Sequence, residues 1–358
     1  IMAYTTINKS TAEFKTKLYT GNGASSLAVV TGIDLTASGG LCIAKNRTAS
    51  NKDWYWVDTV RGASKTIHSN GTGTEQNYTT GITGFNNNGF QVGSATQTNG
   101  SGNTLVGYNF KAGSSVAGST NTAGSIYSTV TANTTSGFSI VKYTGTGANA
   151  TVGHGTGKIP TCILIKNLSQ GDADWAVYHA GTDPSIPANK YLNLNTTGAL
   201  ADGTSPFNDT KPTSSVFYLG NWVSTNGSSQ NMLAYVFSDT QGFSKMGSYI
   251  GNGNVDGTFC FTGFKPSFVM VKRTNSTGNW SVYDDVLPTY NVNNLFTMVN
   301  TADPQEARDS IDFLSNGFKL RNSDLTGTTN INVNGGNYVY MAFGQSLVGT
   351  NNIPANAR

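Results

Sequence analysis

Apolar residues recur at every second position along much of the chain, and the apolar runs are short. The segment 105–110, with Val106, Tyr108 and Phe110 on one side, has this period, which is typical of a strand with a buried face. Clusters of Gly, Asn, Ser and Thr separate such segments and favour tight turns. The pattern predicts an all-β protein. One helical turn is expected at 304–310, where Asp303 and Pro304 supply a cap and a first-turn proline.

The same sequence landmarks occur in the same order three times. They are a Tyr-x-Gly-x-Gly opening at 19, 143 and 249; an apolar strand ending in lysine at 41–45, 163–166 and 268–272; a tryptophan cluster beginning at 54, 175 and 280; a Gly-Phe strand at 88–92 and 316–320, matched more loosely at 216–219; and a closing strand at 105–110, 232–237 and 338–343. Matched order and similar spacing indicate internal repeats.

Each repeat is about as long as a two-sheet β-sandwich. We therefore expect three tandem sandwiches, with Trp54, Trp175 and Trp280 as matched core anchors. A three-bladed propeller is not favoured, because the period is about twice that of a usual blade. The expected boundaries are an N-terminal segment 1–13, repeat 1 at 14–111, an uncharged connection 112–136, repeat 2 at 137–241, repeat 3 at 242–343 and a C-terminal tail 344–358.

Composition narrows the class of partner. Only 11% of the 358 residues are charged, with 22 basic and 19 acidic side chains, so a nucleic-acid partner is not expected. No apolar run is long enough to span a membrane, and the N-terminal residues do not have the pattern of a signal peptide. Cys42, Cys162 and Cys260 are expected to be buried small hydrophobes rather than a disulfide framework, which suits folding in a reducing cytoplasm.

Familiar catalytic and cofactor motifs are incomplete. The Gly-rich openings have Ser26, Ala150 and Asp256 where a dinucleotide fingerprint needs its third glycine. The three histidines lack the spacing of zinc ligands, and the acidic pairs do not recur between repeats. A Ser-His-Asp triad is not excluded by spacing, but the G-x-S-x-G elbow is missing. We expect no enzyme activity, no cofactor and no metal site.

Two tryptophans have no counterpart in the other repeats. Trp56 and Trp222 lie beside polar turn residues, an arrangement that lectin-type sites use to hold sugars. The candidate contact residues are Trp56 and Trp222 as stacking platforms, with Asn221, Asn226 and Asp285 as contacts to sugar hydroxyls. They belong to the loops 51–58 and 220–231 and to the turn at 284–285 near Tyr290. Ordinary packing within a sandwich is the alternative for both tryptophans.

Several longer motifs resemble a known family. These are Y-T-G-N-G at 19–23, V-G-H-G-T-G-K-I-P at 152–160, D-W-A-V-Y-H at 174–179, G-F-K-P-S-F-V-M-V-K-R-T at 263–274, S-N-G-F-K-L-R at 315–321 and I-P-A-N-A-R at 353–358. In these motifs the chain resembles proteins of tailed phages of marine bacteria and cyanobacteria that are usually labelled tail-fibre or virion structural proteins. The resemblance covers essentially the whole chain. Repeat 1 departs from it, because it lacks the Gly-x-x-Pro before its lysine strand.

The resemblance implies jelly-roll-like or concanavalin-like β-sandwich domains and carries no catalytic residues. We expect a non-enzymatic virion surface protein, made in the host cytoplasm, that acts as a tail-fibre or host-recognition component. Two alternatives stay open: a head-decorating or purely structural virion protein, and a glycan-binding lectin or polysaccharide-degrading enzyme. The expected partners are other virion proteins, a host surface glycan and further copies of the chain. A trimer is favoured, because 112–136 and 346–358 suit packing between chains.

Overall fold

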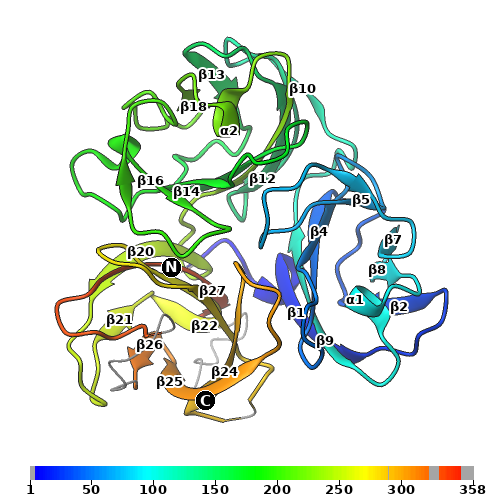
Figure 1. Ribbon diagram of the computed structural model, residues 1–358, viewed down its shortest axis with the longest axis vertical. Coiled ribbons are helices and arrows are strands. Elements are labelled where there is room, and N and C mark those ends of the chain that lie inside the picture. Colours follow the sequence, from blue (N-terminus) through cyan, green and yellow to red (C-terminus); the bar gives the residue numbers. More distant parts are fainter. Residues whose placement is uncertain (1–4, 289, 322–329, 348–358) are drawn as a thin grey trace.

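The structure is a computed structural model that describes residues 5–288, 290–321 and 330–347. Within these residues the only helices are two four-residue α-helices and two three-residue 3-10 helices, and the rest of the regular structure is antiparallel sheet apart from one parallel bridge. The all-β, β-sandwich class is confirmed. Three units lie around a common centre (Figure 1): unit 1 (residues 14–111), unit 2 (119–237) and unit 3 (244–346).

Unit 1 is a sandwich of a four-stranded and a three-stranded sheet. The main sheet has the order β1 (Phe14–Thr20), β9 (Thr104–Lys111), β3 (Gly40–Asn46), β4 (Tyr55–Asp58). The second sheet has the order β2 (Leu27–Val30), β8 (Gly89–Val92), β7 (Ile82–Asn86). The smaller elements are η1 (Ser10–Ala12), the pair β5 (Lys65–Thr66) and β6 (Gln76–Asn77), and α1 (Thr96–Asn99).

Unit 2 repeats this plan with additional strands. Its main sheet has the order β10 (Ser119–Asn121), β11 (Ser128–Asn133), β12 (Phe138–Thr144), β19 (Asn231–Phe237), β14 (Cys162–Asn167), β15 (Ala176–His179), β16 (Lys190–Asn193), β17 (Ala201–Asp202). The second sheet pairs β13 (Ala150–Gly153) with β18 (Val216–Leu219). The short helices are η2 (Pro187–Asn189) and α2 (Val223–Asn226).

Unit 3 joins both layers into one eight-stranded sheet that curls almost into a barrel. Its order is β20 (Ser244–Ile250), β27 (Asn337–Ser346), β22 (Phe264–Arg273), β23 (Trp280–Asp284), β24 (Asn293–Met298), β25 (Glu306–Leu314), β26 (Gly317–Leu320), β21 (Phe259–Phe261). The two end strands, β20 and β21, occupy the positions that β1 and β2 have in unit 1.

The opening tyrosines occupy matching positions. Tyr19, Tyr143 and Tyr249 lie on β1, β12 and β20, and each of these strands pairs with the closing strand of its unit. Each phenol donates to a backbone carbonyl, that of Thr98, Thr225 or Ile331, and each acceptor directly precedes a buried asparagine. The expectation of equivalent strands is confirmed for these tyrosines.

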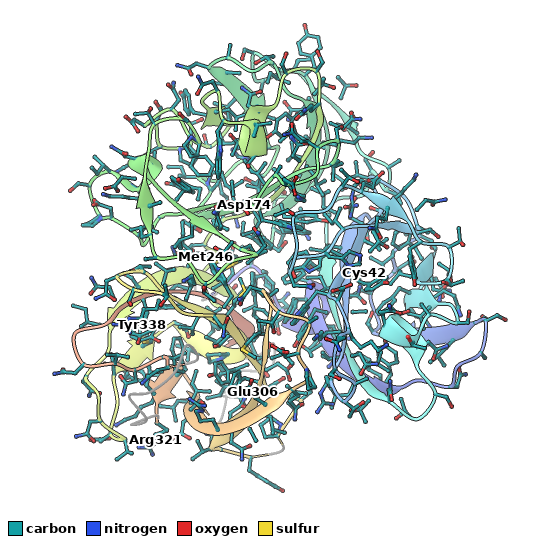
Figure 2. The ribbon with its side chains drawn as sticks, viewed as in Figure 1. Cys42, Asp174, Met246, Glu306, Arg321 and Tyr338 are labelled. Atoms are coloured by element: carbon teal, nitrogen blue, oxygen red, sulfur yellow. The ribbon has the colours of Figure 1, made fainter. Side chains whose placement is uncertain are left out.

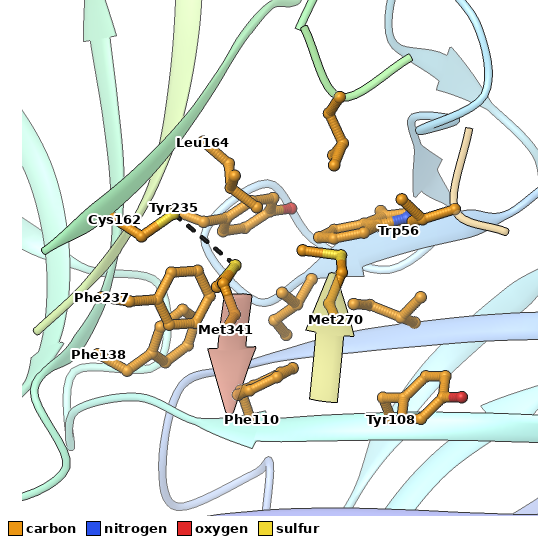
Figure 3. Packing of buried hydrophobic residues seen from close by; sticks show 14 of the residues in the cluster. Trp56, Tyr108, Phe110, Phe138, Cys162, Leu164, Tyr235, Phe237, Met270 and Met341 are labelled. Carbon is orange, nitrogen blue, oxygen red and sulfur yellow. Dashed lines mark hydrogen bonds between the residues drawn. The ribbon is translucent and has the colours of Figure 1, made fainter. Parts of the chain in front are cut away.

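Each main sheet is buried on both faces. In β3, Cys42 and Ala44 face the second sheet of unit 1, whereas Leu41 and Ile43 belong to a core that all three units share. At the centre of this shared core, the closing phenylalanines Phe110, Phe237 and Phe343 contact one another, with ring centroids 5.1–5.7 Å apart. Figure 3 shows Phe110 and Phe237 among the aromatic and methionine side chains of the shared core. The units are therefore parts of one packed body.

Three expectations about segments are wrong. Residues 112–136 are not a plain connection, because they supply β10 and β11 to the sheet of unit 2. Residues 304–310 form no helical turn: β25 runs through them, since Ile311 and Phe313 alternate into the core of unit 3 between β24 and β26. The third repeat does not end at 343, because β27 continues to Ser346; tail residues after 347 lie outside the described residues.

Candidate functional site

The matched tryptophans join the units to one another. The indole N–H of Trp54 donates to the Met298 carbonyl, that of Trp175 to His68 and that of Trp280 to Asn193, each over 2.9 Å. Unit 1 thus bonds to unit 3, unit 2 to unit 1 and unit 3 to unit 2. All three indoles are buried in the shared core. The expected burial of these residues is confirmed, but the expectation that each anchors the core between the sheets of its own sandwich is wrong, because all three lie in the core between units.

A hydrogen bond to an asparagine side chain positions the backbone of each matched tryptophan. The backbone N–H of Trp54, Trp175 and Trp280 donates to the side-chain oxygen of Asn70, Asn195 and Asn300, respectively. Each of these asparagines lies two residues after the carbonyl that accepts an indole N–H from another unit. One short segment of each unit therefore positions that unit's own tryptophan and accepts the indole N–H of a neighbour.

The lysines that end the apolar strands are buried beside these loops. Lys166 donates to the carbonyls of Thr72 in unit 1 and Ala173, at 2.8 and 2.6 Å. Lys272 donates to Thr197 of unit 2 and to its own unit, and Lys45 donates to the carbonyl of Lys52. Burial lowers the pKa of each of these lysines to about 8. Lys166 and Lys272 therefore bond across borders between units, whereas the Lys45 bond lies within unit 1.

A second set of matched residues places ionisable groups at the same borders. Asp58, His179 and Asp284 occupy equivalent strand ends, four residues after the matched tryptophans. The Tyr235 hydroxyl donates to Asp58 and the Tyr108 hydroxyl donates to Asp284, both over 2.8 Å and both between units. At the third border Met341 replaces the tyrosine, and His179 Nε2 lies 3.1 Å from the Tyr340 carbonyl.

The three border groups differ in their electrostatics. Asp58 is paired with the buried guanidinium of Arg61. Burial raises the pKa of Asp284 to about 6, although Tyr108 and two backbone N–H groups donate to it. Burial lowers the pKa of His179 to about 4; the Gly181 N–H donates to its Nδ1, so the neutral ring donates through Nε2 to Tyr340. These groups stabilise packing and face no open cleft.

Trp56 is not a surface platform. Its side chain is 4% exposed and packs in the shared core against Trp175 and Tyr235, with ring centroids 5.5 and 5.7 Å away. Figure 3 shows Trp56 beside Tyr235. The equivalent positions hold Val177 and Val282. The large ring therefore fills space at the centre of the molecule, and a sugar cannot reach it. The expectation that Trp56 stacks on a glycan is wrong for this reason.

Asn226 is also a buried residue whose side chain bonds within unit 2. Its side chain is fully buried and accepts the Thr146 N–H, while its amide donates to the carbonyls of Ala148 and Gly220. It thus holds the Tyr-x-Gly-x-Gly turn, as Asn99 and Asn332 do in the other units. A signal was available in the sequence: each asparagine lies six residues before the first residue of its closing strand as aligned above. Its assignment as a sugar contact is wrong.

The other candidates reach the surface in two different units. Trp222 is partly exposed at the start of α2, packs against the Tyr191 ring at 5.0 Å, and adjoins the exposed Asn221. Asp285 lies in unit 3, in a groove of about 90 Å³ between units 1 and 3 that Lys15 and Lys265 also line. The structure thus keeps Trp222 and Asn221 together as a candidate contact surface and separates Asp285 from them.

The remaining reactive groups are dispersed. In the part of the chain that the structure describes, no three His, Cys, Asp or Glu side chains are grouped so that they could hold a metal ion. The three cysteines are buried and unbridged, and burial raises the pKa of each thiol. Among the described helices, none has the length and apolar character needed to cross a membrane.

Comparison with known proteins identifies a family. No curated protein matches the sequence. A family described as a domain of unknown function (DUF7483) matches residues 9–346, a range that includes all three units together. This agrees with the shared core, because neither the family's extent nor the packing stops at the border of a unit. The chain belongs to this family of domains of unknown function, DUF7483.

Proposed function

We propose that the chain is a non-enzymatic protein of a phage virion surface, acting as a tail-fibre or host-attachment component. The single observation that carries the proposal is the core shared by the three units. Each unit contributes one phenylalanine to the central contact and one indole bond to a neighbour. Separation of the units would expose this apolar surface and leave buried carbonyls unpaired, so the body is suited to holding a fixed shape.

The placement of the ionisable groups supports a non-enzymatic role. Asp284, His179, Lys166 and Lys272 bond to neighbouring units rather than lining an open pocket. Their perturbed pKa values follow from burial at packed borders, a structural cause that does not require a reaction. The whole-chain resemblance to phage virion proteins supports the location.

Host contact is proposed at Trp222 and Asn221. A partly exposed indole, supported by Tyr191, can pack on the C–H face of a sugar ring while the neighbouring amide bonds to hydroxyls. Trp222 stands where unit 1 has Ala95, since both residues cap the equivalent four-residue helix. Trp222→Ala therefore copies a residue that this fold already accepts, and Asn149→Ala, an exposed site in the same unit, is its control.

Localisation and competition together test the proposal. Gold-labelled antibodies raised against the purified chain are applied to intact phage particles, and the purified chain is added to an adsorption assay on host cells. We expect label on the tail and slower adsorption, with Trp222→Ala competing less well than Asn149→Ala. Label on the head without competition would favour the head-decorating alternative. Particles that carry no label would overturn the virion assignment.

A further inference from the structure

The three units differ at the border between the first strand of the main sheet and the first strand of the second sheet, which we call the seam. In unit 2 this seam, between β12 and β13, is filled by the chain itself. β11 pairs with β12 over Ser128–Asn133, and Ile126 forms a parallel bridge to Val152 of β13. The Ile126 N–H donates to the Thr151 carbonyl, and the Thr151 N–H donates to Ser125. An uncharged segment therefore covers both strand edges of unit 2.

The corresponding seams of units 1 and 3 have no such segment in the described part of the chain. β1 and β2 end their sheets in unit 1, and β20 and β21 are the two ends of the eight-stranded sheet in unit 3. Figure 1 shows β2 at the outer side of unit 1 and β21 at the outer side of unit 3, each far from the centre of the molecule. β2 and β21 are therefore edge strands.

In both edge strands, the N–H and C=O groups of every second residue point away from the sheet. In β21 the flanking groups bond inward, since the Thr258 carbonyl accepts from Leu320 and the Thr262 N–H donates to Asn316. Antiparallel ladders alternate, so Phe259 and Phe261 direct their N–H and C=O groups away from β26. In β2 the Thr31 N–H donates to Asn88, and the same alternation directs the backbone groups of Ala28 and Val30 outward.

The side chains at these residues are apolar and uncharged. Val30 is 50% exposed, Phe259 44% and Phe261 55%. Neither strand contains a charged residue or a proline, the devices by which proteins usually prevent edge strands from pairing. Each molecule thus carries two short edges with the same number of outward backbone groups and no charge to oppose their contact.

We propose that β21 of one copy pairs antiparallel with β2 of a second copy. This register places Phe259 opposite Val30 and Phe261 opposite Ala28, and these residues can exchange four backbone hydrogen bonds. Aromatic and β-branched residues are favourable cross-strand neighbours. A second copy is the occupant because it carries the complementary edge; pairing of β21 with itself would leave β2 uncovered. The contact is heterologous, so it builds a ring or a row of copies. It does not depend on the proposed virion location.

Two single variants test the pairing in the full-length chain. Val30→Lys places a charge on β2, and Phe261→Lys places one on β21; Tyr127→Lys, at a 70% exposed aromatic beside the filled seam, is the control. Sedimentation velocity is measured up to ~1 mM protein, the range in which weak contacts are populated. We expect the unmodified chain and Tyr127→Lys to associate with rising concentration, and each of the other variants to remain monomeric.

A mixture of the two variants identifies the partners. Val30→Lys keeps an intact β21 and Phe261→Lys keeps an intact β2, so an equimolar mixture should form dimers and nothing larger. If Val30→Lys associates as the unmodified chain does, or if the mixture stays monomeric, the β21–β2 pairing is wrong. An unmodified chain that is monomeric throughout would also overturn it. Circular dichroism verifies folding, and Val30→Ser and Phe261→Ser replace any lysine variant that fails to fold.

Discussion

The indole N–H of Trp54 donates to the backbone carbonyl of Met298 over 2.9 Å, although 244 positions separate the two residues in the sequence. The equivalent bonds of Trp175 and Trp280 complete a ring in which every unit both donates and accepts. Figure 2 shows side chains filling the space between the units, with Met246 at the border of units 2 and 3. The stability of one unit is therefore tied to that of the others.

Truncation of one matched tryptophan should destabilise the whole molecule. Trp54→Ala removes a fully buried ring, which should lower the free energy of unfolding by about 3–5 kcal/mol. Trp54→Phe keeps a ring but leaves the Met298 carbonyl without its donor, so a loss of about 1–3 kcal/mol is expected. Guanidinium unfolding followed by circular dichroism measures both. A single shifted transition is expected; separate transitions for one unit and for the other two would contradict the shared-core interpretation.

Equivalent border residues should give opposite pH dependences. Asp284 has a pKa of about 6 in the folded chain against 3.8 ordinarily, so between about pH 4 and 6 the folded state binds the extra proton and stability falls as pH rises. His179 has a pKa of about 4 against 6.5, so the unfolded state binds the extra proton and stability rises over about pH 4 to 6.5. Each contribution is at most about 3 kcal/mol.

Unfolding free energies measured from pH 4 to 7 separate these two effects. Relative to the unmodified chain, Asp284→Asn should remove the falling contribution and His179→Gln the rising one. The difference curves of the two variants should therefore have slopes of opposite sign. Asp209→Asn, which changes an exposed carboxylate, serves as the control for nonspecific charge effects. Equal slopes for the two border variants would contradict the assigned pKa shifts.

Two asparagines five positions apart should respond very differently to substitution. Asn226→Ala leaves the Thr146 N–H and two carbonyls without partners in the interior, so a loss of about 2–4 kcal/mol is expected. Asn221→Ala changes an exposed residue and should shift stability by less than about 0.5 kcal/mol. Thermal unfolding of the two variants provides the comparison. Similar stability of both would remove the structural role given to Asn226.

Replacement of Trp56 by valine, the residue at the equivalent positions of units 2 and 3, tests whether its ring stabilises the shared core. Trp56→Val introduces the residue found at the equivalent positions 177 and 282. The ring of Trp56 packs against Trp175 and Tyr235, and valine is too small to fill the space that this ring occupies. The resulting cavity should cost about 3–5 kcal/mol. Trp222→Ala, which truncates a partly exposed ring, should cost less. If the order is reversed in urea unfolding, the central position assigned to Trp56 is not energetically important.

The sequence by itself determined the β class, the order of the repeats and the matched anchors. These features follow from local chemistry: alternation with period two specifies strands, and Gly, Asn and Ser specify turns. The recurrence of Tyr19, Tyr143 and Tyr249 was therefore readable without a structure, and so was the burial of the three matched tryptophans. The helical turn expected at Pro304 was wrong because a local start signal was weaker than the pairing of β25 on both sides.

Only the tertiary structure decided what covers the face of each main sheet that points away from the second sheet of its own unit. An apolar residue on that face has the same local pattern whether it meets solvent, a ligand or another unit, so Trp56 was placed on the surface although three units converge on it. Asn226 shows the same difficulty for a polar residue, because only the folded turn reveals that its amide is fully used. Within residues 112–136, β11 formed on the open edge of β12, and β10 paired with β11. Contacts between residues that are distant in the chain decided each of these outcomes, between units for Trp56 and within unit 2 for Asn226 and β11. A local sequence pattern does not contain the free energy of such contacts.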